Sequence, residues 1–141
     1  MTLWVVDASV VVKWYVPEDD TPAALELRKS EVKLAAPDLL FMELANILWR
    51  LVRRGEMQPP RAIEIIEKIV AAPFITYTNE SLARDSIDLA LATGLSAYDA
   101  SYVALAARLN VQCITADQRL VRKLAGTPAA DHVRLLNGSV H

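Results

Sequence analysis

Several features that would narrow the function of a protein are absent from this sequence. The only cysteine, Cys113, lies in an apolar run and has no second cysteine to pair with, which indicates a small buried side chain in a reducing compartment. No uncharged apolar run approaches the ~18 residues of a transmembrane helix, and Asp7 and Lys13 interrupt the apolar start that a signal peptide would need. We therefore expect a cytoplasmic protein without a membrane segment.

An excess of basic residues is absent as well. The 15 basic and 17 acidic residues give a formal net charge of -2, so the chain carries no overall electrostatic footprint for nucleic acid. Any such binding must come from a local patch or from bound cations. Apolar residues, by contrast, make up 53% of the 141 residues, which is typical of a globular chain. A chain of this length predicts one domain, residues 1–141, and no internal repeat divides it.

Short apolar segments alternate with helical ones along the chain. The sequence predicts strands at 3–6, 32–35, 74–78, 112–115 and 133–136, and helices over 8–15, 18–30, 39–54, 59–72, 79–93, 96–109 and 117–124. A continuously apolar strand such as 3–6 is typical of a parallel sheet that is covered on both faces. We therefore expect an α/β fold, a three-layer α/β/α sandwich around a mainly parallel five-stranded sheet with right-handed crossovers.

Three residues are expected at helix ends. Gly55 follows the helix over 39–54, where a C-terminal cap requires a left-handed residue, and Asn110 follows the helix over 96–109 in the same way. Asn79 is predicted to cap the helix that begins there.

Two carboxylates stand directly after predicted strands. Asp7 ends the first apolar run, and Asp117 follows the strand at 112–115. Open parallel sheets bind their ligands beyond the carboxyl ends of the strands, so both positions are candidates for a functional site. Each residue also has a structural interpretation, because a helix is predicted after it and Asp is a favoured N-cap.

Two further carboxylates lie in unusually apolar helices. Glu43 interrupts the helix over 39–54, in which eleven of sixteen residues are apolar, so most faces of this helix are expected to be covered. Glu43, Asn46 and Arg50 share one stripe that faces something wet or charged, either a site or simply solvent. Asp99 lies among small and apolar residues, and its structural alternative is a capping box with Ser96.

The four carboxylates are more informative together than singly. If they converge at one edge of the sheet they repel one another, unless a cation lies between them. All the donors are hard oxygen atoms, and neither His132 nor His141 falls in these segments. The set therefore favours Mg2+ or Mn2+ over Zn2+.

These residues also match a known family. The quoted segments are Asp7 in VVDASVVVKW, Glu43 in PDLLFMELANILW, Asp99 in LSAYDASYVALA and Asp117 in ITADQRL. Together they resemble the PIN-domain ribonucleases, and among them the VapC-type toxins of bacterial and archaeal toxin-antitoxin pairs, over nearly the whole chain. The family often has Gly near Asn110, and Asn can adopt the same left-handed turn.

The resemblance implies a PIN-like fold and a metal-dependent endoribonuclease that hydrolyses RNA. It implies that the four acids are catalytic and bind one or two Mg2+ or Mn2+ ions, with Ser9, Asn46 and Thr115 beside them or against the substrate phosphate. A cognate antitoxin and a homodimer are the implied partners, and the high apolar content favours both. Candidate phosphate contacts are Arg50, Arg53, Arg54, Arg119, Arg122 and Lys123.

Two other functions remain to be weighed. A catalytically inactive PIN-like module would bind protein or RNA without cleaving it, and the intact set of four acids counts against that alternative. A phosphotransfer fold would also place Asp at a strand end. The sequence lacks the Asp-x-Asp after its first strand and the strand-end Lys that such a fold would have.

Overall fold

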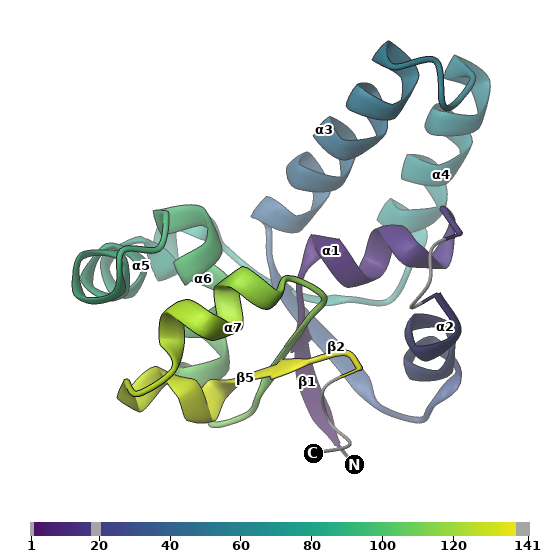
Figure 1. Cartoon of the computed structure of the whole chain (residues 1–141). Coiled ribbons are helices and arrows are strands. Elements are labelled where there is room, and N and C mark those ends of the chain that lie inside the picture. Colours follow the sequence, from purple (N-terminus) through teal and green to yellow (C-terminus); the bar gives the residue numbers. More distant parts are fainter. Residues whose placement is uncertain (1, 18–20, 138–141) are drawn as a thin grey trace.

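A five-stranded sheet forms the centre of the computed structural model, which describes residues 2–17 and 21–137 (Figure 1). The strands are β1 (Leu3–Val6), β2 (Lys33–Pro37), β3 (Ile75–Tyr77), β4 (Cys113–Thr115) and β5 (Val133–Leu135), in the order β3-β2-β1-β4-β5. Every neighbouring pair is parallel. The predicted α/β fold is confirmed, and the sheet is entirely rather than mainly parallel.

Helices fill the segments between the strands. They are α1 (Ala8–Val11) with the 3-10 turn η1 (Val12–Trp14), α2 (Thr21–Lys29), α3 (Leu39–Arg53), α4 (Pro59–Ala71), α5 (Asn79–Thr93), α6 (Ala97–Leu109), α7 (Gln118–Leu124) and the 3-10 turn η2 (Pro128–His132). The predicted helix over 18–30 is present from Thr21, and its first three positions lie outside the described residues. Figure 1 shows α5, α6 and α7 on one side of the sheet and α1 to α4 on the other. No helix in the described part of the chain has the length and apolarity to cross a bilayer.

The central strand β1 is buried from both sides. Val5 and Val6 are fully buried, as are Leu40 and Leu44 of α3 and Leu105 of α6. Each such side chain contributes about 1.5 to 3 kcal/mol on leaving water. This two-sided burial explains the continuous apolar run that precedes Asp7, and it fixes the position of the end of β1.

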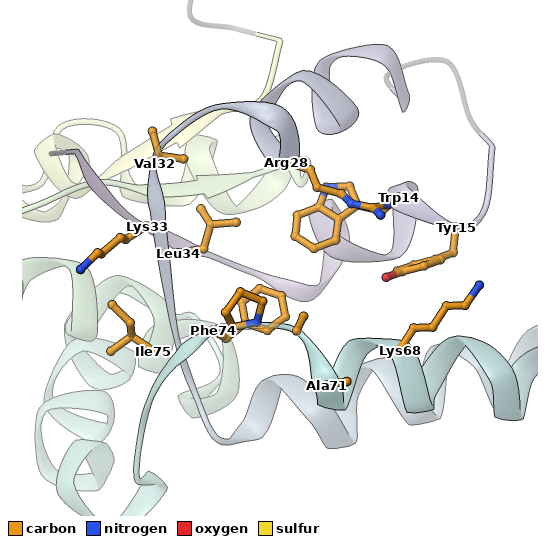
Figure 2. A pocket seen from close by; sticks show the side chains of 12 residues that line it. Trp14, Tyr15, Arg28, Val32, Lys33, Leu34, Lys68, Ala71, Phe74 and Ile75 are labelled. Carbon is orange, nitrogen blue, oxygen red and sulfur yellow. The ribbon is translucent and has the colours of Figure 1, made fainter.

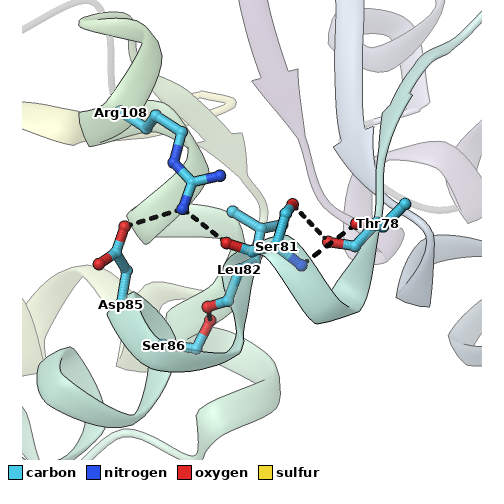
Figure 3. Close-up of polar contacts among 6 residues, drawn as sticks. All are labelled: Thr78, Ser81, Leu82, Asp85, Ser86 and Arg108. Carbon is cyan, nitrogen blue, oxygen red and sulfur yellow. Dashed lines mark hydrogen bonds and ion pairs between the residues drawn. The ribbon is translucent and has the colours of Figure 1, made fainter.

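The residues at helix ends confirm two of the three predictions. Gly55 and Asn110 have left-handed backbones, with φ of 75° and 55°. The prediction for Asn79 was wrong: Thr78 has the extended backbone of an N-cap, and its hydroxyl accepts a hydrogen bond from the Ser81 amide at 3.1 Å (Figure 3). The Asn79 side chain instead accepts from the amide of Leu39 at 3.0 Å, so it caps the start of α3.

An arginine joins α6 to α5. Arg108 donates to the carbonyl of Ser81 at 2.7 Å and to the carboxylate of Asp85 at 2.9 Å (Figure 3). These two bonds tie the C-terminal end of α6 to the start of α5. They help to fix the helix that carries Asp99 near its other end.

Helix α3 is less covered than the sequence predicts. It leaves the sheet with α4 as a projecting hairpin (Figure 1), and a single line of residues, Leu40, Leu44 and Leu48, is buried. Met42 is 70% exposed and Trp49 54% exposed. The expectation that most faces of this helix are covered was therefore wrong for the single chain, because α3 contacts the rest of the protein mainly along one face.

Candidate active site

The order in which strands join the sheet changes direction at β1. From β1 the chain proceeds to β2 and β3 on one side, then returns to place β4 and β5 on the other. The crevice at such a reversal is where open parallel sheets bind ligands. Val6 pairs with Ile114, so Asp7 and Asp117 follow adjacent strands at the same edge of the sheet.

Asp7 is held by groups at the ends of both strands. It is only 8% exposed, and it begins α1 by accepting a hydrogen bond from the Ser9 amide at 3.0 Å. The Ser9 hydroxyl donates to the same carboxylate oxygen. Burial raises the pKa of Asp7 from its ordinary 3.8 to about 6, although hydrogen bonds from Ser9 and Thr115 act in the opposite direction. The structural and the functional interpretations of Asp7 are thus compatible.

Ser9 and Thr115 connect the two strand ends. The Ser9 hydroxyl accepts from the Ala116 amide at 2.9 Å and lies 3.4 Å from the Thr115 hydroxyl oxygen. Thr115 in turn accepts from the Asp117 amide at 3.0 Å. The predicted residues Asp7, Ser9, Thr115 and Asp117 therefore lie in one hydrogen-bonded network.

Glu43 reaches the same region from α3. The phenol of Tyr102, on α6, donates a hydrogen bond to its Oε1 atom. Burial raises the pKa of Glu43, the bond from Tyr102 partly offsets this, and the charge of Asp99 raises the pKa further. Tyr102 was not among the residues predicted from the sequence, although its position three residues after Asp99 places both on one side of a helix.

Asp99 and Asp117 complete the set. Asp99 is half-buried in the first turn of α6, and burial and then the charge of Asp117 raise its pKa, while Arg119 and Lys123 lower it. The Ser96 hydroxyl accepts from the Asp99 amide at 3.0 Å, so the Ser96 half of the capping-box alternative is present. Asp117 begins α7 and accepts from the Arg119 amide at 2.9 Å.

The charges of the four carboxylates act on one another in neighbouring pairs. The charge of Glu43 acts on Asp7, that of Asp99 on Glu43 and that of Asp117 on Asp99, each raising a pKa. This mutual repulsion and the hard oxygen donors fit a divalent cation such as Mg2+. Within residues 2–17 and 21–137, the present side-chain positions bring no three acidic, histidine or cysteine groups close enough together to hold one ion. The carboxylates would have to turn toward a common point.

Other predicted residues lie outside this cluster. Asn46 is exposed on α3, one turn beyond Glu43, and does not share the burial of the cluster. Further along the same helix, the guanidinium of Arg53 stacks on Trp49 at 5.1 Å. Of the predicted basic patches, Arg119 and Lys123 are the cations that act on a carboxylate of the site.

A large cavity lies away from the carboxylates. Its volume is about 790 Å³, and its lining includes residues at the starts of β2 and β3 (Figure 2). Asp7 and Asp117, by contrast, follow the ends of β1 and β4. Trp14 and Phe74 stack in it with ring centroids 5.8 Å apart, and Arg28 lies over the Trp14 ring. Lys33 and Lys68 also line it, and none of the lining residues within 2–17 and 21–137 is acidic. Its aromatic and cationic lining differs from the acidic cluster.

Comparison with known proteins gives concordant matches. Residues 4–126 match the model of the PIN domain family. Ribonuclease VapC3 of Pyrobaculum aerophilum is 33% identical over 121 residues, which cover 84% of this chain and 92% of that protein. A crystal structure of a protein from the same organism is 26% identical, with a TM-score of 0.67 over 89% of this chain and 82% of that one.

A more distant likeness concerns the fold alone. The structure of VapBC2 from Rickettsia felis, bound to a DNA fragment from its promoter, includes a chain that is 11% identical, with a TM-score of 0.65. The match covers 95% of this chain and 98% of that one. The arrangement of strands and helices is therefore shared even where few residues are.

Proposed function

Because the chain belongs to the PIN-domain family, we propose that it is an endoribonuclease that hydrolyses RNA phosphodiester bonds in the cytoplasm, as the toxin of a toxin-antitoxin pair. The observation that carries this proposal is the linked set of four carboxylates at the reversal of strand order. The ribonuclease relative, which is similar over most of its own length, supports the same reaction class.

We assign Asp7, Glu43, Asp99 and Asp117 as the ligands of one or two Mg2+ or Mn2+ ions. When bound, such a cation lowers the pKa of a water molecule and stabilises the negative charge that develops on a phosphodiester during hydrolysis. The mutually raised pKa values support this assignment, because a nearby cation would favour the ionised form of each acid.

The chain's own groups have separate tasks in this mechanism. Ser9 and Thr115 hold the Asp7 carboxylate in place through the network between β1 and β4. Arg119 and Lys123, beside Asp99, are suited to bind a phosphate of the RNA backbone, because both are exposed cations at the edge of the acidic cluster. We further propose that Asn46 contacts the substrate rather than the cation, since it is exposed one turn beyond Glu43.

Incubation of the purified protein with single-stranded RNA tests the proposal. Cleavage is expected in Mg2+ or Mn2+ and not in EDTA, and Asp7→Asn is expected to abolish it without loss of the folded state. Asp88→Asn is the matched control, because Asp88 is an exposed aspartate on α5 outside the cluster. Binding of RNA without cleavage under all metal conditions would support the inactive module instead.

We also propose that a cognate antitoxin occupies the cavity of Figure 2. The three cations Arg28, Lys33 and Lys68 line an aromatic and aliphatic cavity, and no acidic residue of the described part of the chain joins them, so the cavity fits an acidic segment with an apolar anchor. Co-purification with the product of an adjacent short reading frame is expected. Lys33→Glu should weaken this association, whereas Lys29→Glu, an exposed lysine outside the lining, should leave it intact.

A homodimer is the second assembly that we propose. Ile87 on α5 is 52% exposed and Tyr98 at the start of α6 is 66% exposed, and both line an apolar groove of about 600 Å³. A surface of this kind is typical of protein interfaces. Light scattering at micromolar concentration is expected to give the mass of a dimer, and Ile87→Glu to give a monomer. A monomeric wild type would contradict the proposal.

A further inference from the structure

The structure assigns Tyr102 as a positioning residue that fixes one oxygen of the Glu43 carboxylate and thereby leaves the other free for a cation. This inference rests on the proposed function, because it concerns the same site. It begins from the bond that the Tyr102 phenol donates to Oε1 of Glu43, between side chains 59 positions apart in the sequence.

Tyr102 is buried, which makes its hydroxyl group significant. The residue is only 2% exposed and packs in the main apolar core with Leu105. A buried hydroxyl without a partner costs about 1 to 3 kcal/mol, so the phenol of Tyr102 needs an acceptor at this place. A phenylalanine would fill nearly the same volume without that need. The hydroxyl therefore has a purpose beyond packing, and Glu43 is the acceptor that it meets.

Glu43 needs such a partner more than the aspartates do. Asp7 and Asp117 are short side chains that accept backbone amide bonds at the starts of α1 and α7. Glu43 has an additional rotatable bond and projects from the middle of a turn of α3, where no helix start offers amides to it. The bond from Tyr102 removes part of this freedom before a cation arrives.

The geometry divides the Glu43 carboxylate between two tasks. Oε1 accepts from Tyr102, so Oε2 is the oxygen that remains for a cation. Tyr102 and Asp99 are three residues apart on α6, and the charge of Asp99 acts on Glu43. Helix α6 thus carries one acid, Asp99, and also Tyr102, which orients a second acid, Glu43. Partners of this kind commonly change metal affinity by 10- to 100-fold.

The test compares Tyr102→Phe with Tyr77→Phe. Tyr77 is the last residue of β3, which carries none of the four acids, so its hydroxyl is the control. Calorimetric titration of metal-free protein with Mn2+ is expected to show at least a 10-fold larger dissociation constant for Tyr102→Phe and no change for Tyr77→Phe. In RNA cleavage kcat should fall while KM for RNA is retained. Added Mn2+ should partly restore the rate.

A second variant separates positioning from stability. Glu43→Asp keeps the charge but shortens the side chain, so it loses the bond to Tyr102. Its Mn2+ affinity should fall to the level of Tyr102→Phe, and combining the two substitutions should cause no additional loss. If Tyr102→Phe does not fold, Glu43→Asp alone still tests the positioning of the carboxylate.

The outcomes distinguish the inference from the function on which it rests. If a folded Tyr102→Phe or Glu43→Asp protein binds Mn2+ as tightly as an active wild type, the inference is overturned. The proposed nuclease function is then unaffected. A wild type that neither binds Mn2+ nor cleaves RNA overturns both. Losses that simply add in the double variant would show that Tyr102 and Glu43 act separately, which also overturns it.

Discussion

Replacement of Asp7 by Asn should stabilise the metal-free protein at neutral pH while it abolishes catalysis. The reason is the burial of this carboxylate, which raises its pKa from 3.8 to about 6. The folded state therefore resists the ionised form that predominates in the unfolded chain above pH 4. Asn has the same shape and is neutral, so it does not carry this penalty.

The magnitude follows from the shift in pKa. A difference of about two pH units corresponds to about 3 kcal/mol between the protonated and ionised forms, at 1.36 kcal/mol for each unit. Asn keeps an oxygen that can accept from the Ser9 amide and caps a helix about as well as Asp. Its amide group must also find an acceptor in a buried place, which costs about 1 to 2 kcal/mol. We expect a net gain of about 1 to 2 kcal/mol.

The sign of the pH dependence gives an internal check. The folded pKa of Asp7 is above the unfolded one, so its contribution is complete below about pH 4 and is lost as the pH rises to about 6. Thermal melts in EDTA should show the difference between Asp7→Asn and wild type at pH 7.5. The difference should shrink toward pH 4.5. A domain of this size shifts by roughly 3 °C for each kcal/mol.

The same melting assay can also be carried out with added Mg2+. Mg2+ should raise the wild-type melting temperature, because binding to the native state stabilises by about 2.7 kcal/mol at 100 times the dissociation constant. Asp7→Asn should respond less, and Asp88→Asn should behave as wild type. If Asp7→Asn melts below wild type in EDTA at pH 7.5, then its role as the cap of α1 outweighs its burial and the reasoning fails.

Other substitutions probe the remaining acids. In EDTA, Asp99→Asn should melt at or above the wild-type temperature because it relieves repulsion from Asp117. Ser96→Ala, in contrast, should lower the free energy of unfolding by about 1 kcal/mol through loss of the N-cap. If Asp99→Asn is destabilised and its melting temperature does not respond to metal, Asp99 is a structural residue. Glu43→Gln should reduce RNA cleavage by orders of magnitude at unchanged folding, measured by initial rates and circular dichroism. Asp117→Asn should reduce the rate less, since an amide oxygen can still coordinate a cation and cap α7; a loss equal to that of Glu43→Gln would contradict this.

The strand-end carboxylates were predictable because a local pattern carries the information. A buried parallel strand needs a continuous apolar run, and the first polar residue after it marks the end of the strand. This is why Asp7 and Asp117 could be placed at one edge from the sequence alone. The partition of strands on either side of β1 required the structure, because nothing in a single strand specifies its neighbours.

Two errors have a common physical origin. The apolar content of α3 predicts a helix covered on most faces, yet Met42 and Trp49 are exposed in the single chain. Composition measures the tendency to be buried, and it does not say whether the same chain or another one provides the cover. Asn79 was likewise placed as a cap from its residue type, and it does cap a helix, but that helix is α3. Capping across 40 positions leaves no local signal.

The bond between Tyr102 and Glu43 was also beyond local patterns. Tyr102 is only 2% exposed, so its hydroxyl needs an acceptor within the protein. Which acceptor its hydroxyl meets depends on how α3 and α6 approach each other. Long-range polar contacts of this kind are the part of the site that sequence reasoning could not supply.

The reversal of strand order has a consequence during synthesis. Asp7 is made before β4, and the hydroxyl groups of Ser9 and Thr115, which meet at the site, are 106 residues apart. A ribosome that adds 5 to 20 residues per second needs roughly 5 to 20 s between them. Until β4 has emerged and paired with β1, a growing chain lacks both Thr115 and Asp117. Products that terminate before β4 should therefore be harmless to the RNA around them, and activity should appear only after β4 and Asp117 have been translated.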